Sequence, residues 1–226
     1  MKKVAFILLA AGKGARFGAS KPKQFFEMHG KPLIFWSLKS IAKHSFSQVV
    51  ITLPKEYLHR KKGLIGRIHK TVECVAGGDT RWQSLRNAMK KIRSGTDFVF
   101  VHDGARPNFN QAWLAKMLTL LKSKPTFSTV IPVVSLRDTV KLNHGKLKTF
   151  AKRELLCLAQ TPQLSKVKDL LEAIKKIPGR VNVLDEGQAM EKIGKKSVGF
   201  KGSPTNIKIT FPEDFAVAKI LRKGRS

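Results

Sequence analysis

Small residues and basic side chains follow the first apolar segment of the chain. Gly12 and Gly14 come shortly after the run 4–9, and Lys13 and Arg16 stand beside them. Glycines let backbone N–H groups approach phosphate oxygens, and the cations add positive charge. We interpret this segment as a phosphate-binding loop, with a simple tight turn as the alternative that the same glycines allow.

A second basic segment follows, and residues 20–24 read Ser-Lys-Pro-Lys-Gln. Pro22 and Pro32 favour extended backbone in this region, which carries Lys23 back toward the same phosphates. The third glycine of a dinucleotide-binding fingerprint is missing at the required spacing, and no G-x-x-x-x-G-K-[ST] loop occurs. The pattern therefore indicates phosphate binding outside these two standard motifs.

The elements that must position these loops alternate along the chain. Short apolar runs rich in β-branched residues are typical of buried parallel strands, and the segments between them show apolar residues at helical spacing. The expected strands are Val4–Leu9, Val49–Leu53, Thr71–Val75, Phe98–Val101 and Ser128–Val133, and the expected helices are Leu33–Ala42, Ser84–Ile92 and Ala112–Leu121. We predict an α/β fold with a doubly wound, mostly parallel, Rossmann-like sheet and helices on both faces. Ligands then bind at the carboxyl ends of the strands.

One stretch breaks this rhythm. Residues 135–150 alternate in polarity around a turn at 143–145, which reads Asn-His-Gly. This is the pattern of a β-hairpin with both faces partly exposed. We expect a protruding arm that packs against a second subunit in a homodimer.

The overall composition predicts one globular domain over residues 1–226. Hydrophobic residues make up 42% of the chain. The apolar N-terminal run is short and ends in the glycine loop, so we interpret it as a strand rather than a signal peptide. No apolar run reaches the roughly 18 residues of a membrane span. We expect Cys74 and Cys157, which both lie in apolar stretches, to be buried free thiols, as in a cytoplasmic protein.

The net charge of +29 is the unusual feature, with 44 Lys and Arg against 15 Asp and Glu. Such an excess indicates an anionic partner, which could be nucleic acid, a membrane surface or a phosphorylated small molecule. The basic residues are interleaved with apolar ones, as on solvated helix faces. A basic composition shared across the lineage explains most of the excess, and a few cations remain as functional candidates.

Seven further motifs stand in a fixed order with the first glycine loop, Ala10-Ala11-Gly12-x-Gly14-x-Arg16. They are Pro22-Lys23-Gln24, residues 77–84 (GGDTRWQS), residues 101–107 (VHDGARP), Arg137-Asp138-Thr139, Thr161-Pro162-Gln163, Asp185-Glu186 and residues 206–210 (NIKIT). Together they resemble the sugar-phosphate nucleotidyltransferases, and among these the 2-C-methyl-D-erythritol 4-phosphate cytidylyltransferase family of the non-mevalonate isoprenoid pathway. The resemblance covers about residues 4 to 222. It implies an enzyme that transfers CMP from CTP to a sugar-alcohol phosphate and releases pyrophosphate.

The resemblance also implies roles on the CTP side. Arg16 and Lys23 would stabilise charge on the triphosphate as the α-phosphorus reacts, in a reaction that depends on positioning and charge neutralisation and needs no nucleophilic side chain. The backbone cradle would consist of Ala10, Ala11, Gly12 and Gly14, and the cytosine-reading loop would consist of Gly78, Asp79 and Ser84. Asp79 or Thr80 could instead cap a helix, and both roles could hold together.

On the acceptor side, the resemblance assigns Arg106, Thr139, Arg153, Thr161 and Lys208. Arg153 and Thr139 would reach the active site of the neighbouring subunit, so that the homodimer shares its sites. We interpret 206–210 as an alternating strand that turns Lys208 toward the substrate.

Asp103 ends the apolar run 98–101 and would lie at the carboxyl edge of the sheet. Its carboxylate could contact the ribose hydroxyls, a Mg²⁺ ion or the acceptor. Gly104 belongs to the same substrate-binding loop and replaces a common alanine. We interpret His102 as structural rather than as an acid–base catalyst.

Besides Gly104, three departures from the family pattern are Leu184 before the Asp-Glu pair, Thr205 before Asn206, and Phe211 before Pro212. Related enzymes bind metal with an aspartate near position 205. We therefore assign no protein metal ligand and expect Mg²⁺ to be bound mainly through the CTP triphosphate.

Two alternatives remain open. The first is a cytidylyltransferase for ribitol 5-phosphate or another sugar phosphate, with the same CTP loops and different acceptor contacts. The second is a basic nucleic-acid-binding protein, which the charge suggests. The basic runs have few interleaved aromatic residues, and no helix-turn-helix or RNA-recognition pattern occurs, so we expect no specific nucleic-acid binding.

Overall fold

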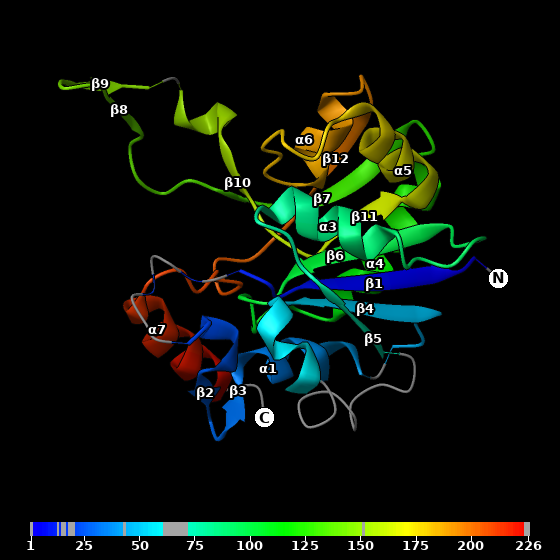
Figure 1. Cartoon of the computed structure of the whole chain (residues 1–226). Helices are drawn as coiled ribbons and strands as arrows, with labels where there is room; N and C mark the ends of the chain where they lie inside the picture. The colour runs from blue at the N-terminus through cyan, green and yellow to red at the C-terminus, as the bar shows by residue number, and fades with distance from the viewer. Residues whose placement is uncertain are drawn as a thin grey trace.

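A central sheet organises the chain in the computed structural model, which describes residues 2–12, 14, 17, 21–42, 44–60, 72–150 and 152–223 (Figure 1). Among the described residues, eight strands form this sheet in the order β10-β7-β11-β6-β1-β4-β5, with β12 paired to β7. The sheet strands are β1 (Val4–Leu9), β4 (Gln48–Leu53), β5 (Val72–Ala76), β6 (Phe98–Asp103), β7 (Phe127–Ser135), β10 (Cys157–Ala159), β11 (Gln163–Lys166) and β12 (Lys196–Lys201).

The helices are α1 (Leu33–Ile41), α3 (Arg81–Met89), α4 (Ala112–Ser123), α5 (Val167–Lys176), α6 (Glu186–Glu191) and α7 (Pro212–Lys223). Short 3-10 turns occur at η2 (Lys23–Phe25), η3 (Lys55–Arg60) and η4 (Arg153–Leu155), and two small ribbons pair β2 (Glu27–Met28) with β3 (Lys31–Pro32) and β8 (Lys141–Asn143) with β9 (Leu147–Thr149).

Helices cover both faces of the sheet, and successive side chains of a buried strand point to opposite faces. Phe6 on β1 belongs to a core cluster that also contains Leu38 of α1 and Met117 of α4. The next residue, Ile7, belongs to a second cluster with Trp82 of α3 and Leu170 of α5. A parallel strand buried on both faces must be apolar throughout, which explains the continuous run of β1. The predicted doubly wound α/β arrangement is confirmed.

The sheet is parallel where β1 pairs with β4 and β6, where β4 pairs with β5, and where β7 pairs with β12. The prediction did not include β11, which lies antiparallel between β6 and β7, or the antiparallel edge strand β10. Both are too short to show a clear period in the sequence.

The prediction of a strand at 206–210 was wrong. This segment is irregular in the structure, and it is tied to the loop after β6 where the N–H of Ile209 donates to the carbonyl of Ala105 at 2.9 Å. Ile209 is fully buried against Met28 and Leu33. The alternation of Ile207 and Ile209 with polar residues therefore belongs to a packed irregular loop, in which Asn206 is buried as well.

The predicted hairpin is present. Strands β8 and β9 pair antiparallel, and Gly145 in their turn has a φ of +81°. In Figure 1 the ribbon extends away from the sheet at the upper left. Every residue of both strands is exposed.

Cys74 and Cys157 are both free, but the expectation that they are buried was wrong. Cys74 is half-buried, and Cys157 is exposed because it lies on the edge strand β10. Among the described residues, no helix has both the length and the apolar character that a membrane crossing requires.

Candidate active site

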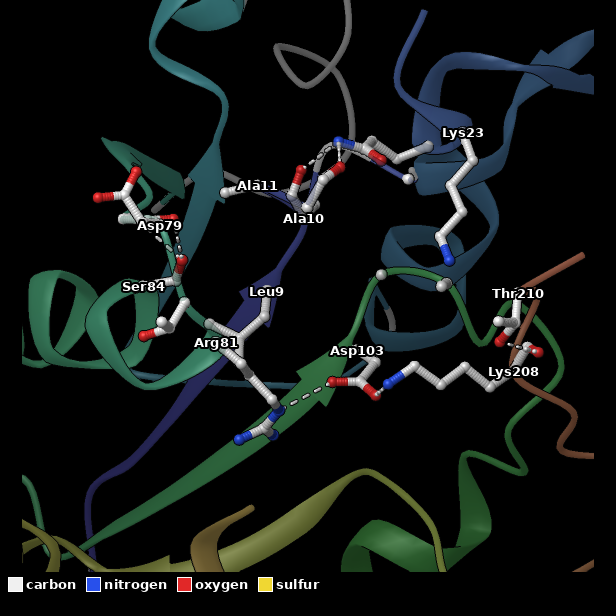
Figure 2. A pocket seen from close by; sticks show the side chains of 17 residues that line it. Leu9, Ala10, Ala11, Lys23, Asp79, Arg81, Ser84, Asp103, Lys208 and Thr210 are labelled. Atoms are coloured by element: carbon white, nitrogen blue, oxygen red, sulfur yellow. Dashed lines mark hydrogen bonds and ion pairs between the residues drawn. The ribbon is translucent and has the colours of Figure 1, made fainter. Parts of the chain in front are cut away.

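A cavity of about 480 Å³ opens at the carboxyl ends of the parallel strands (Figure 2). Leu9 of β1 is in register with Asp103 of β6, so the residues that follow the two strands meet at the same edge of the sheet. The cavity is lined by Leu9, Ala10, Ala11, Gly12, Gly14, Lys23, Gln24, Gly78, Asp79, Thr80, Arg81, Ser84, Asp103, Gly104, Ala105, Lys208 and Thr210. Eleven residues proposed from the sequence are among them.

The first glycine loop is held from the side by Gln24. The side-chain amide of Gln24 donates to the carbonyl of Ala10 at 2.6 Å and to that of Gly12 at 3.2 Å. Gly14 has a φ of +70°, which favours glycine. The loop is therefore fixed by its neighbour and keeps an open, small-residue surface toward the cavity. Arg16 lies outside the described residues.

Lys23 joins two segments that are far apart in the sequence. Its Nζ donates to the carbonyl of Ile209 at 2.5 Å, so the turn η2 and the loop 206–210 lie on the same side of the cavity. Figure 2 shows Lys23 and Lys208 with their side chains directed into the same space.

The second glycine-rich loop enters α3 through a capping box. Thr80 is the N-cap, and its side chain accepts from the N–H of Gln83, while the Gln83 side chain accepts from the N–H of Thr80. The capping alternative is thus correct for Thr80. The Ser84 hydroxyl accepts from the N–H of Gly78 at 3.0 Å, and Asp79 lines the cavity.

The carboxylate of Asp103 lies among three cations at the base of the cavity. Its Oδ1 is 3.3 Å from Nε of Arg81, and its Oδ2 is 2.8 Å from Nζ of Lys208 and 3.9 Å from Nε of Arg106. Burial alone would raise the pKa of Asp103, but the charges of Arg81, Lys208 and Arg106 outweigh it and hold the pKa well below its usual range. Asp103 is therefore ionised.

The sequence assigned no role to Arg81 or Glu186, although both stand within quoted motifs. Glu186 is fully buried, and its two oxygens accept from Arg81 at 2.8 and 3.1 Å. Burial opposes the charge of Arg81, but Glu186 and Asp103 raise its pKa. The available signal was that Arg81 opens a helix, where the macrodipole disfavours a cation unless a carboxylate compensates it.

Thr161 lies behind Asp103 and is 4% exposed, outside the residues that line the cavity. Its hydroxyl oxygen accepts from the N–H of Asp103 at 3.0 Å and lies 3.0 Å from Nδ1 of His102. The pKa of His102 is lowered to about 4, chiefly by burial, so the ring is neutral at pH 7. Since Nε2 contacts the carbonyl of Arg106, it carries the proton, and Nδ1 accepts from Thr161.

The remaining predicted residues do not line the cavity. Arg106 is buried and donates to the carbonyl of Asn206 at 2.7 Å. Thr139 is exposed at the base of the arm. Arg153 is exposed in η4 and donates to the carbonyl of Arg137 at 2.8 Å. Among the described residues, the single chain thus brings the predicted CTP-side residues together and keeps Thr139 and Arg153 apart from them.

The chain is similar over its length to proteins of known function. Residues 4–223 match the family model described as 2-C-methyl-D-erythritol 4-phosphate cytidylyltransferase, IspD. The enzyme of that name from Dechloromonas aromatica is 35% identical over 228 residues, with 97% of each protein covered. The bifunctional enzyme IspD/IspF of Desulfotalea psychrophila is 33% identical over 222 residues, which cover 97% of this chain and 56% of the relative. The chain thus spans about half the length of that relative.

The fold is also found among solved structures. The 4-diphosphocytidyl-2C-methyl-D-erythritol synthase from Anaerococcus prevotii superposes with a TM-score of 0.85, covering 98% of this chain and 96% of that one. The two sequences are 22% identical, so this likeness concerns the fold alone.

Proposed function

The chain belongs to the 2-C-methyl-D-erythritol 4-phosphate cytidylyltransferase family, and from this membership we infer that its cavity transfers CMP from CTP to 2-C-methyl-D-erythritol 4-phosphate and releases pyrophosphate. The observation that carries the inference is the meeting of two glycine-rich loops with Lys23, Asp103 and Lys208 in one cavity at the carboxyl edge of the sheet. Family and cavity point to the same chemistry.

The transfer is a single displacement. An oxygen of the acceptor phosphate attacks the α-phosphorus of CTP, and the bond from that phosphorus to the β-phosphate oxygen breaks. Both reactants are anionic, so catalysis consists of holding them in line and neutralising the charge that develops. Lys23 acts on the triphosphate and Lys208 on the acceptor side, and Arg16 is proposed beside Lys23.

Base recognition belongs to the second glycine-rich loop. Gly78 and Ser84 already bond to each other, so the loop is pre-organised before the nucleotide enters. Backbone groups of the loop, the Ser84 hydroxyl and Asp79 offer donors and acceptors for the cytosine edge. Gly77 of this loop has no room for a β-carbon against Ala11, and we expect such a compact loop to exclude a purine.

Mg²⁺ in this cavity would be held chiefly by the phosphates of CTP. Among the described lining residues, the carboxylates are Asp79, which the proposal gives to the base, and Asp103, which already contacts three cations. The described residues contain no group of three or more His, Cys, Asp or Glu side chains that could form a protein cage. Mg²⁺ bound mainly through the triphosphate would neutralise charge on the leaving pyrophosphate.

A homodimer completes the site in this proposal. Thr139 and Arg153, the acceptor contacts expected from the family, lie beside the arm and not in the cavity of their own chain. Exposed apolar side chains mark the same region, with Leu147 71% and Leu155 79% exposed. Packing the arm on a second subunit would bury them and deliver Arg153 to the neighbouring cavity.

Pyrophosphate release with a matrix of substrates tests the function. CTP, UTP, ATP and GTP are each combined with 2-C-methyl-D-erythritol 4-phosphate, with ribitol 5-phosphate or with no acceptor. We expect turnover with CTP and the methylerythritol phosphate to exceed every other combination. Equal turnover of UTP and CTP would remove the cytosine assignment, and a preference for ribitol 5-phosphate would change the acceptor. A parallel salt titration of binding to a mixed-sequence RNA should show only weak, salt-sensitive retention.

A further inference from the structure

The carboxylate of Asp103 is held from two opposite sides. Oδ1 receives Nε of Arg81 and Oδ2 receives Nζ of Lys208, and Figure 2 shows the three side chains in one row across the base of the cavity. The two cations differ in how firmly they are held. The side chain of Lys208 is 41% exposed, whereas that of Arg81 is 20% exposed and also forms an ion pair with a second carboxylate.

This second carboxylate belongs to Glu186. Both oxygens of Glu186 accept from the two terminal nitrogens of Arg81, which leaves Nε for Asp103. Such paired hydrogen bonds fix the plane of a guanidinium. Glu186 is itself fixed, because it opens α6 and its N–H donates to Oε1 of Gln163 at 3.1 Å.

Three elements far apart in the sequence meet in this way. Arg81 is the first residue of α3, Glu186 the first of α6, and Asp103 the last of β6. An isolated buried ion pair contributes little to stability, since desolvation offsets the attraction. The geometry of this pair is better explained by what it does to Asp103.

We propose that Arg81, held in place by Glu186, is a positioning residue for the reaction, which fixes Asp103 so that its second oxygen faces Lys208 in the cavity. The proposal rests on the proposed function. Neither Arg81 nor Glu186 needs to touch a substrate. With Asp103 anchored, Lys208 is placed before the acceptor binds. Without Arg81, Asp103 turns toward Lys208 and Arg106, and the lysine is withdrawn from the substrate.

Four variants separate positioning from a purely structural role. Arg81→Met removes the cation but leaves Glu186 buried without its partner, and it should lower both stability and kcat. The double variant Arg81→Met/Glu186→Met replaces the pair with apolar side chains of similar size, and it should recover much of the lost stability. Arg81→Lys keeps the positive charge but loses the planar guanidinium that makes paired hydrogen bonds with Glu186. Lys176→Met is the control, because it removes a cation from an exposed ion pair with Glu172.

We expect the double variant to remain about 10²-fold below the wild type in kcat, the usual order for one lost electrostatic contact. Its KM for CTP should change less than kcat, because the side-chain hydrogen bonds of Arg81 go to Asp103 and Glu186 and not to the groups proposed to bind the nucleotide. Arg81→Lys should restore part of the rate. Recovery of wild-type kcat in the folded double variant would overturn the proposal, since the pair would then be structural.

A second readout does not depend on turnover. Among the described residues, the groups that face Asp103 are Arg81 from α3, Lys208 from the loop 206–210, and Arg106 and His102 from its own segment, with Glu186 behind Arg81. NMR can follow the carboxyl carbon of Asp103, with its signal assigned by comparison with Asp103→Asn. In the double variant this carboxyl group should titrate at a higher pH than in the wild type. An unchanged titration would contradict the proposal. A wild-type enzyme that forms no product from CTP would instead refute the proposed function, and the titration would still report on Asp103.

Discussion

Gly77 and Ala11 leave no space between the two glycine-rich loops. A β-carbon placed on Gly77 would lie 2.1 Å from Cβ of Ala11, which is far inside contact distance. The two loops beside the nucleotide cavity are therefore in close contact, and they can approach this closely because Gly77 has no side chain.

Gly77→Ala should force the loops apart. We expect a loss of about 1–3 kcal/mol in the free energy of unfolding, as for other overpacked sites, and a higher KM for CTP. Urea unfolding and CTP titration measure the two effects. Gly199→Ala is the control, because its β-carbon would meet Val133 at an ordinary 3.4 Å. A Gly77→Ala enzyme as stable and as active as the control would show that the loops can separate freely.

Lys23→Ala should lower kcat by on the order of 10²–10³, because it removes one pre-organised charge from the triphosphate. The free energy of unfolding should change far less. Lys21→Ala is a matched control, since Lys21 lies in the same basic segment with its Nζ 4.9 Å from the Phe26 ring centre. Steady-state kinetics of both variants measure kcat. If Lys23→Ala keeps more than a tenth of the wild-type kcat, Lys23 does not stabilise the reacting triphosphate. The same change at Arg16 should have a similar effect.

Stability should fall as the pH drops from about 6.5 toward 4. His102 is neutral in the fold with a pKa lowered to about 4, whereas the unfolded chain protonates near its ordinary value of 6.5. The unfolded state therefore binds more protons in this window, and acid favours unfolding. The shift corresponds to roughly 3 kcal/mol at about 1.4 kcal/mol per pKa unit.

Urea unfolding of the wild type and of His102→Gln across this range measures the effect. Gln can keep the donor to the carbonyl of Arg106 but does not titrate. The wild type should lose its advantage in the free energy of unfolding over His102→Gln as the pH falls from 6.5 toward 4. Parallel pH dependences would mean that His102 takes up its proton at the same pH in the native and the unfolded protein.

Arg153→Ala and Lys23→Ala should complement each other. If the chain forms the proposed homodimer, each variant alone should be nearly inactive, because each lacks one half of every shared site. After subunit exchange, about half of the dimers are mixed, and each mixed dimer has one intact site. About a quarter of wild-type activity should return if the sites are independent. No recovery, with exchange verified by mass spectrometry, would place the action of Arg153 within its own chain.

The fold could be predicted from the sequence where the pattern was continuous. The strand β1 is apolar throughout because both of its faces are buried, and the loops that follow β1 and β6 meet because parallel strands end at one edge. The short strand β11 could not be predicted, since four residues carry no measurable period. The loop 206–210 was mistaken for a strand because Ile207 and Ile209 alternate with polar residues, although the backbone of this segment is irregular.

The candidate site was predictable to a similar extent. The motifs named the residues that reach the cavity, such as Lys23 and Asp103. They did not reveal the partnership between Arg81 and Glu186, which are 105 positions apart, because a pairing of that kind is visible only after folding. Thr161 was expected at the substrate, and the structure places its hydroxyl between the Asp103 backbone and His102.

The fate of labelled phosphate tests the central claim most directly. The protein is incubated with Mg²⁺, 2-C-methyl-D-erythritol 4-phosphate and CTP labelled at either the α- or the γ-phosphorus. The organic products are then separated from pyrophosphate. The proposed displacement predicts that the α-label enters the organic product only when the acceptor is present, that the γ-label leaves entirely as pyrophosphate, and that Lys23→Ala suppresses both transfers. Appearance of the γ-label in the organic product, or equal release of pyrophosphate without acceptor, would contradict cytidylyl transfer at this cavity.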